Sequence, residues 1–419
     1  MRQFLLLVFL LNVCALPAQD SLYTRAILKE LTSEKYNGRG YVKNGDCKAA
    51  RYIAKEMKSA GLQPAMYGKW FQQFSFPVNT FPSAVKCRLG NRELIPGVDF
   101  IVDPGMSTLI GDFQVVTINR SLAAYSAAEL KGKFILLDTV GTGFHLDKED
   151  LQAWKKNPFG AAGMIFVQAK KLTWSVSTTD KKFPIVEVLK DVIEGEITTI
   201  NVEVKAKFIP DYKTANVAGY IPGSTQPDSF VFITAHYDHL GRMGTEAYFP
   251  GANDNASGVS MLLNLGRYFT KPENRPSYSL VFVAFAGEEA GLRGSAYYTQ
   301  QPVVPLNKIR FLLNLDLLGT GDDGMMVVNA TEFPAEFSIF DSLNTAGGYM
   351  PKLGKRGKAA NSDHYYFSEK GVPSFFCYTL GGISAYHDVL DVEKTLPLTR
   401  YKEAFGLLSR FIAAMASQH

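Results

Sequence analysis

Histidine and carboxylate side chains recur beside the strand-like apolar runs in the second half of this chain. In chain order they are His236, Asp238, Asp254, Glu288, Glu289, Asp316 and His387. Ligands of open α/β sheets gather beyond the carboxyl ends of the strands, so we expect these side chains to converge. Imidazole nitrogens and carboxylate oxygens are ligands of catalytic zinc, which keeps one coordination position open. The pattern therefore predicts a catalytic zinc site.

The ligand types would suit two metal ions. Two zinc ions about 3.5–4 Å apart need a shared ligand, and a short carboxylate on a fixed turn suits that bridge. Taken singly, Asp254 could be a helix cap, and Glu288 with Glu289 a solvated loop. Together they are harder to explain this way, because four of the six histidines fall in these acidic loops: His236, His239, His364 and His387.

The elements that would position these residues alternate between strands and helices from residue 214 onward. Strands are expected at 217–221, 230–235, 278–286, 309–317, 325–328 and 372–378, and helices at 257–269, 294–300, 334–344 and 392–416. Nearly continuous apolar strands between helices favour a mostly parallel, mixed sheet with helices on both faces. The fold class is therefore α/β.

The residues before 206 follow a different pattern of expected helices and strands. Residues 21–64 read as two amphipathic helices and 71–78 as a strand. Residues 87–205 carry short β-like runs separated by turn signals, which predicts a small β-rich inserted domain. Within it, the phrases at 130–137 and 160–167 resemble the protease-associated domain, a non-catalytic insert of several exopeptidase families. We therefore expect a signal peptide at 1–19, a first part of the α/β domain at 20–86, the insert at 87–205, and the main part of the α/β domain at 206–419.

The first residues resemble an export signal. Arg2 precedes the apolar runs 4–11 and 13–16, and the small residue Ala18 follows them. The alternative is a buried N-terminal strand or helix, since the apolar stretch is too short for an ordinary transmembrane helix. The sequence thus predicts an exported protein, periplasmic or secreted.

The cysteines, at 14, 47, 87 and 377, form no CxxC pair, which argues against a disulfide scaffold or cysteine-bound zinc.

The charge balance excludes one class of partner. Lys and Arg number 44 and Asp and Glu 40 in 419 residues, giving a net charge of +4 with no basic block. We therefore expect no nucleic-acid partner and, beyond the N-terminus, no membrane span. No heptad or repeat indicates an oligomeric state.

The order of the motifs is that of a known family. The segments at 236–239, 251–258, 287–289, 314–316, 362–364 and 386–387 resemble metallopeptidase family 28, the co-catalytic di-zinc aminopeptidases. The resemblance implies two Zn²⁺ ions per chain, one bound by His236 and Asp316, the other by Glu289 and His387, with Asp254 bridging. It implies that Glu288 is the general base, that Asp238 orients His236, and that the bond between Asp254 and Asn255 is cis.

The implied reaction is hydrolysis of the first peptide bond of peptides with a free N-terminus. A water bridged between the metals would attack the carbonyl, while Glu288 takes its proton and delivers it to the leaving amine. This sequence departs from the family at Ala359, where relatives can place an oxyanion-stabilising tyrosine. Tyr365, Tyr366 and Tyr386 are candidate substrate-binding replacements; the alternative is that zinc stabilises the oxyanion alone.

Three alternatives remain open at this stage. A glutaminyl-peptide cyclotransferase shares the fold but uses one zinc and does not need the first histidine, which His236 supplies here. A carboxypeptidase of the same superfamily would need arginines near the metals, for which Arg242 and Arg293 are candidates. A catalytically inactive binding module would have no need for Glu288 and the five ligands together.

Overall fold

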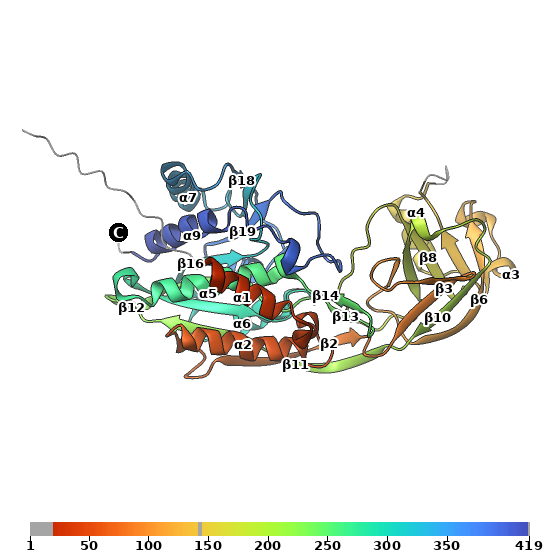
Figure 1. Cartoon of the computed structure of the whole chain (residues 1–419), viewed down its shortest axis with the longest axis horizontal. Helices are drawn as coiled ribbons and strands as arrows, with labels where there is room; N and C mark the ends of the chain where they lie inside the picture. Colours follow the sequence, from red (N-terminus) through yellow and green to blue (C-terminus); the bar gives the residue numbers. More distant parts are fainter. Residues whose placement is uncertain (1–19, 141–144, 418–419) are drawn as a thin grey trace, which may run out of the picture.

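Two β-sheets lie side by side in the computed structural model, which describes residues 20–140 and 145–417. A nine-stranded sheet with helices forms one body and an eight-stranded sheet with little helix forms the other (Figure 1). The expected signal peptide, residues 1–19, lies outside the described residues. Within the described residues, no helix is long and apolar enough to cross a membrane.

The nine-stranded sheet has a parallel centre and antiparallel flanks. Its order is β1-β11-β15-β12-β16-β19-β17-β18, with β2 also paired to β11. The strands are β1 (Gln63–Pro64), β2 (Phe71–Thr80), β11 (Lys207–Ile221), β12 (Gln226–His236), β15 (Tyr278–Phe285), β16 (Ile309–Leu315), β17 (Gly324–Val328), β18 (Leu353–Lys355) and β19 (Ser374–Leu380). Strands β15, β12, β16 and β19 run parallel to one another, whereas β1, β2 and β15 pair with β11 in antiparallel fashion.

Helices cover both faces of this sheet, as predicted. They are α1 (Ser21–Leu31), α2 (Gly45–Ser59), α5 (Gly258–Phe269), α6 (Arg293–Gln300), α7 (Pro334–Gly347), α8 (His364–Glu369) and α9 (Tyr401–Met415). Alternate side chains of β12 separate the two layers: Val231 and Ile233 join the core under α1, α2, α5, α7 and α9, while Phe232 packs with α6 and α8. Both faces of the central strands are therefore buried, which explains their continuous apolar runs.

The eight-stranded sheet has the order β4-β3-β10-β6-β7-β8-β9-β5. Its strands are β3 (Val85–Leu89), β4 (Arg92–Leu94), β5 (Phe100–Val102), β6 (Leu109–Ile118), β7 (Phe134–Leu137), β8 (Gly163–Gln168), β9 (Ile185–Leu189) and β10 (Thr199–Val204), accompanied by the short helices α3 (Ala127–Leu130) and α4 (Lys148–Lys155). We call residues 85–204 the β-module. The small β-rich domain expected from the sequence is present.

The β-module shares part of its core with the α/β body. Strands β2 and β11 pair along their length and carry the chain into and out of the module (Figure 1). The hairpin of β13 (Gly241–Met243) and β14 (Ala247–Phe249) comes from the α/β body, yet Met243 and Phe249 belong to the core of the module. The two bodies are thus joined by packed side chains as well as by the chain.

Two elements differ by the most from their predicted bounds. The helix expected at 392–416 begins only at Tyr401, after a short 3₁₀ turn at Glu393–Thr395. Pro397 explains the delay, because a proline disfavours helical conformation in the residue before it. The strand expected at 217–221 is the end of the fifteen-residue β11, whose first half is polar and pairs with β2. Cys47, Cys87 and Cys377 are free, in agreement with the prediction.

Candidate metal centre

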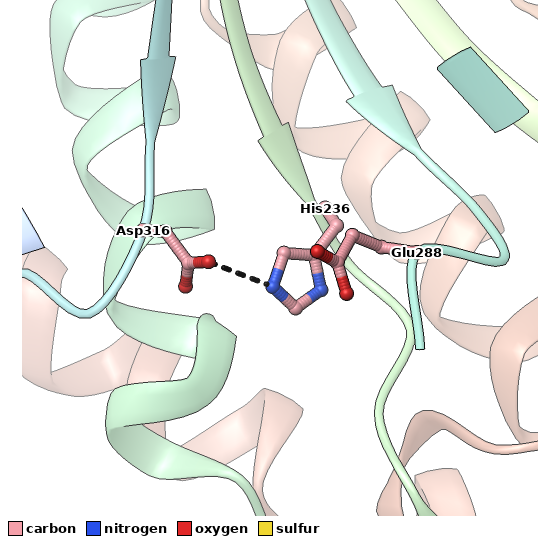
Figure 2. Close-up of side chains that lie close together, drawn as sticks. All are labelled: His236, Glu288 and Asp316. Carbon is pink, nitrogen blue, oxygen red and sulfur yellow. Dashed lines mark ion pairs between the residues drawn. The ribbon is translucent and has the colours of Figure 1, made fainter. Parts of the chain in front are cut away.

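Three of the predicted residues meet where parallel strands end. His236 is the last residue of β12, Asp316 follows β16 directly, and Glu288 lies in the turn after β15. Since β12 lies between β15 and β16 in parallel register, the three side chains emerge at one edge of the sheet. Figure 2 shows them pointing into the same space, with His236 between the two carboxylates.

The five predicted ligands form two sets that share Asp254. His236 Nε2 lies 3.3 Å from Asp254 Oδ1 and 3.3 Å from Asp316 Oδ2. His387 Nε2 lies 3.1 Å from Asp254 Oδ2 and 3.2 Å from Glu289 Oε2. Two ligand atoms of a tetrahedral zinc with bonds of 2.0–2.2 Å are about 3.3–3.6 Å apart. The donor atoms of the first set match this separation and those of the second set lie slightly closer together, so each set could hold one zinc, with one oxygen of Asp254 for each.

The other ring nitrogen of each histidine meets a main-chain carbonyl. His236 Nδ1 lies 3.2 Å from the carbonyl oxygen of Asp238, and His387 Nδ1 lies 2.9 Å from that of Trp174. Such a hydrogen bond fixes the tautomer that leaves Nε2 free for a metal. In addition, Asp316 Oδ1 is buried with no hydrogen-bond partner among the described residues, as expected of an oxygen that faces a cation.

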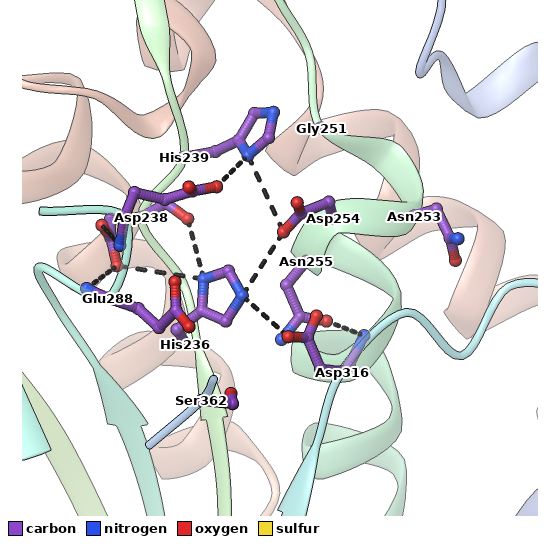
Figure 3. A network of polar contacts seen from close by, with 12 residues as sticks. His236, Asp238, His239, Gly251, Asn253, Asp254, Asn255, Glu288, Asp316 and Ser362 are labelled. Carbon is purple, nitrogen blue, oxygen red and sulfur yellow. Dashed lines mark hydrogen bonds and ion pairs between the residues drawn. The ribbon is translucent and has the colours of Figure 1, made fainter. Parts of the chain in front are cut away.

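His239 lies beside the set formed by Glu289, His387 and Asp254, but we do not count it among the ligands. Its Nδ1 is 2.8 Å from Glu289 Oε1 and 3.8 Å from Asp254 Oδ1, so these three residues could also surround an ion. The shorter distance is that of a hydrogen bond, and Glu289 offers its other oxygen to His387. We therefore assign His239 to orienting Glu289, as shown with its neighbours in Figure 3.

Asp238 is adjacent to His236, but its carboxylate acts elsewhere. That carboxylate lies 4.0 Å from His236 Nδ1, farther than the Asp238 main-chain oxygen. It accepts hydrogen bonds from the hydroxyl of Tyr41 at 2.6 Å and from the main-chain N–H groups of Glu288 and Glu289 at 3.1 and 3.3 Å. Figure 3 shows Asp238 beside Glu288. The side chain thus holds the turn that carries both glutamates, a role that the sequence reasoning missed.

The loop that carries Asp254 is held by a second buried acid. The peptide bond from Asp254 to Asn255 is cis, as the resemblance implied. Asp391 accepts hydrogen bonds from the main-chain N–H groups of Asn253 at 2.8 Å and Asp254 at 3.0 Å. Burial raises the pKa of Asp391 to about 6, and these two hydrogen bonds oppose the shift. Sequence reasoning did not identify Asp391, which is far from Asp254 along the chain.

Arg39 holds the same loop from the other side. Its side chain is fully buried, and its guanidinium donates hydrogen bonds to five main-chain carbonyls. The acceptors are those of Leu31, Tyr237, Pro250, Gly251 and Asp254. The turn sits so close to β13 that a Cβ on Gly40 would lie 2.4 Å from the Cα of Gly241. Arg39 therefore ties the first turn of the body to the loops of His236 and Asp254.

Glu288 differs from the ligands in its contacts. Among the described residues, it makes no ion pair with His236 like those of Asp254 and Asp316, although His236, Glu288 and Asp316 lie close enough together to surround an ion. Burial raises the pKa of Glu288 well above its ordinary value; the neighbouring carboxylates of Glu289, Asp363 and Asp316 raise it further, whereas His236 lowers it. A carboxylate that binds a proton readily beside the metal ligands is suited to act as a general base.

A cavity of about 190 Å³ opens onto these residues. It is lined by His236, Asp254, Glu288, Asp316, Leu317, Asn361, Phe376, Tyr378, Tyr386 and His387. Of the three candidate tyrosines, only Tyr386 is among the lining residues, where it stacks on His387 with ring centroids 4.0 Å apart. Tyr365 and Tyr366 lie on α8 and contact each other. Leu317 and Asn361 line the cavity without having been predicted.

The two candidate carboxylate-binding arginines are engaged elsewhere. Arg242 donates to Asn37, Thr245 and Glu34, and Arg293 donates to Ala290 and Thr178. Neither is among the residues that line the cavity. The arginines proposed for recognition of a peptide C-terminus are thus not at the candidate site.

Comparison with known proteins agrees with this geometry. Residues 216–412 match the model of the family described as Peptidase family M28. Aminopeptidase YwaD of Bacillus subtilis is 28% identical over 262 residues, which cover 59% of this chain and 53% of that sequence. A probable zinc metalloprotease of Pyricularia oryzae is 40% identical over 116 residues, covering 27% of this chain and 23% of that sequence. The matches thus span about half or less of the length of these relatives.

A likeness in fold extends over almost the whole chain. The crystal structure of BSAP, a zinc aminopeptidase from Bacillus subtilis, superposes with a TM-score of 0.75 at 18% identity. The superposition covers 96% of this chain and 96% of the other. The likeness therefore includes the β-module as well as the α/β body.

Proposed function

Because the chain belongs to peptidase family M28 through residues 216–412, we propose that it is a zinc-dependent aminopeptidase with two zinc ions per chain. The observation that carries the proposal is that the two oxygens of Asp254 each face the Nε2 atom of a different histidine, His236 and His387. Each pair is completed by one further carboxylate, from Asp316 or Glu289. The names of the relatives, an aminopeptidase and a zinc metalloprotease, support the same activity.

The residues divide the work of hydrolysis between them. His236 and Asp316 would hold one zinc, Glu289 and His387 the other, and Asp254 would bridge. Bound zinc supplies a Lewis acid for the scissile carbonyl and lowers the pKa of water toward neutrality. Glu288 takes a proton from the attacking water and later donates it to the leaving amine, which makes the amine a better leaving group.

The lining of the cavity favours a free N-terminus as the recognised group. None of the lining residues in the described chain is Lys or Arg, so no side-chain cation is present there to bind a C-terminal carboxylate. We further propose that the hydroxyl of Tyr386, which lies beside His387, takes the oxyanion-stabilising role that Ala359 cannot fill.

The cellular location, the domain organisation and the partners are proposed from the sequence. The pattern of residues 1–19 supports export, with a periplasmic or secreted destination. We assign residues 87–205 to a protease-associated-like domain within a peptidase formed by residues 20–86 and 206–419. Its partners are peptides with a free N-terminus, without nucleic acid.

The test is hydrolysis of a panel of aminoacyl-p-nitroanilides beside their N-acetylated counterparts. Each substrate is offered to the untreated protein, to the protein after a chelator, and after zinc is returned. We expect cleavage of free-amine substrates alone, lost with the chelator and restored by zinc. The panel also measures which side chains the cavity prefers.

Other outcomes identify the competing activities. A protein that binds one zinc per chain and cyclises N-terminal glutamine is a cyclotransferase. A protein that binds zinc but releases residues only from the C-terminus of peptides is a carboxypeptidase. Zinc binding without turnover of any of these substrates would contradict the enzymatic proposal.

A further inference from the structure

One segment of the β-module reaches the metal centre itself. Between β8 and β9 the chain leaves the module's sheet, and residues 171–174 lie against the loop that carries His387. The loop and the segment are more than two hundred residues apart in sequence. In the part of the chain that the structure describes, His387 is the metal-centre residue that the module contacts in this way.

Two hydrogen bonds join the main chain of Trp174 to His387, one to its main chain and one to its ring. The N–H group of Trp174 donates to the carbonyl oxygen of His387 at 3.0 Å. In return, His387 Nδ1 lies 2.9 Å from the carbonyl oxygen of Trp174, so the ring donates this bond when Nε2 is free. The pair fixes both the backbone and the ring of a residue whose φ of +54° is uncommon for a side chain other than glycine.

Lys171 fastens the same loop on both sides of His387. Its ammonium lies 2.9 Å from Asp388 Oδ2 and donates to the carbonyl oxygen of Ser384 at 2.7 Å. Asp388 in turn accepts hydrogen bonds from the main-chain N–H groups of Tyr386 and Leu390. The ion pair is partly buried, with 36% of the lysine side chain and 11% of the aspartate side chain exposed.

The segment is itself anchored firmly in the module. The indole N–H of Trp174 donates to the carbonyl oxygen of Val102 in β5 at 2.8 Å. The same ring stacks on Phe249 of β14, with centroids 4.8 Å apart and planes 22° from parallel. Because Trp174 is held in the core of the module and is hydrogen-bonded to His387, the position of His387 depends on the position of the module.

We propose that the β-module is a structural part of one metal site: Lys171 and Trp174 position His387, and so set the zinc affinity of the Glu289–His387 set. This inference rests on the proposed two-zinc function. Among the described residues, the His236–Asp316 set has no comparable contact with the module. Its histidine is oriented instead by the main chain of Asp238. A displacement of the module should therefore affect one zinc and spare the other.

The test measures zinc affinity directly, by competition with a chromophoric chelator. Each site is isolated by removing a ligand of the other: Asp316→Ala leaves the Glu289–His387 set, and His387→Ala leaves the His236–Asp316 set. Lys171→Met is then added to each background. Loss of a residue that orients a metal ligand typically lowers metal affinity about 10- to 100-fold, and we expect this loss only in the Asp316→Ala background.

Two control variants separate positioning from charge. Lys181→Met removes the same charge from the same module, but Lys181 pairs with Asp103 within the module, so both affinities should stay unchanged. Lys171→Arg keeps the cation and should retain most of the affinity.

The outcomes distinguish this inference from the proposed function. Two zinc ions in the unmodified protein with equal affinities in Lys171→Met and Lys181→Met would overturn the positioning role and leave the aminopeptidase intact. A similar loss in both single-site backgrounds would also overturn it, since the effect would then be general. Failure of the unmodified protein to bind a second zinc would instead refute the two-metal function.

Discussion

Replacement of Arg39 by lysine tests how the first turn of the chain supports the metal centre. The guanidinium donates five hydrogen bonds to main-chain oxygens at 2.6–3.3 Å, and the side chain has no exposed surface. A lysine keeps the charge but has three donors on a single nitrogen. At least two of the five carbonyl groups must therefore lose their partner in Arg39→Lys.

The size of the effect follows from those two bonds. A hydrogen bond to a charged group contributes about 1.5–3 kcal/mol, so we expect the free energy of unfolding to fall by about 3–6 kcal/mol. That is a large part of the total stability of a typical domain, about 5–15 kcal/mol. The loops that carry Tyr237 and Asp254 should loosen together, since the guanidinium of Arg39 binds carbonyl groups in both.

The assay is urea unfolding of the metal-free protein followed by far-ultraviolet circular dichroism and by tryptophan fluorescence. Agreement of the two probes is needed before a single free energy is assigned. Arg92→Lys is the matched control, because Arg92 pairs with Glu194 at the surface of the β-module and its loss should change stability by less than about 0.5 kcal/mol. If Arg39→Lys unfolds within about 1 kcal/mol of the unmodified protein, the carbonyl cluster is not a stabilising feature.

Three further predictions concern the chemistry. Glu288→Gln should keep both zinc ions but lose about 10²–10⁴-fold in turnover of a free-amine substrate, and a variant that retains most activity would show that another group is the base. Tyr386→Phe should lower kcat by about 10²-fold while Tyr365→Phe leaves it unchanged; equal rates in the two variants would remove Tyr386 from the oxyanion role. Burial raises the pKa of Asp46 to about 6 from 3.8, so its contribution to stability is full below pH 4 and falls by about 3 kcal/mol as the pH rises from about 4 through 6. Unfolding of Asp46→Asn measured from pH 4 to 7 should lack this fall, and an identical pH profile in both proteins would contradict the shift.

The convergence of the metal-centre side chains was predictable because it depends on local sequence. A parallel strand that is buried on both faces reads as an apolar run, and its end is marked by the first polar residue. His236, Asp316 and the Glu288–Glu289 pair follow such runs directly, so the sheet alone brings them together. The cis bond at Asp254 was implied by the resemblance and not by the residues themselves.

The supporting residues were not predictable, because their contacts are long-range and often involve the main chain. Asp391 and Trp174 act on Asp254 and His387 from distant parts of the chain, and no local pattern marks them. The tyrosines at 365 and 366 were misleading for a similar reason. Their place in sequence after Ser362 is close to the site, but the start of α8 determines where they point.

The pairing of β2 with β11 has a consequence for how the chain folds. Thr80 lies opposite Lys207, so the chain leaves the large sheet and returns to it at adjacent positions. Joining these strands across an unfolded module would require closing a long flexible loop, which is entropically unfavourable and slows the formation of distant contacts. A module that has already folded brings the two ends close together. We therefore expect the β-module to fold early, with the pairing of β2 and β11, and then the sheet that holds the zinc ligands, forming after it.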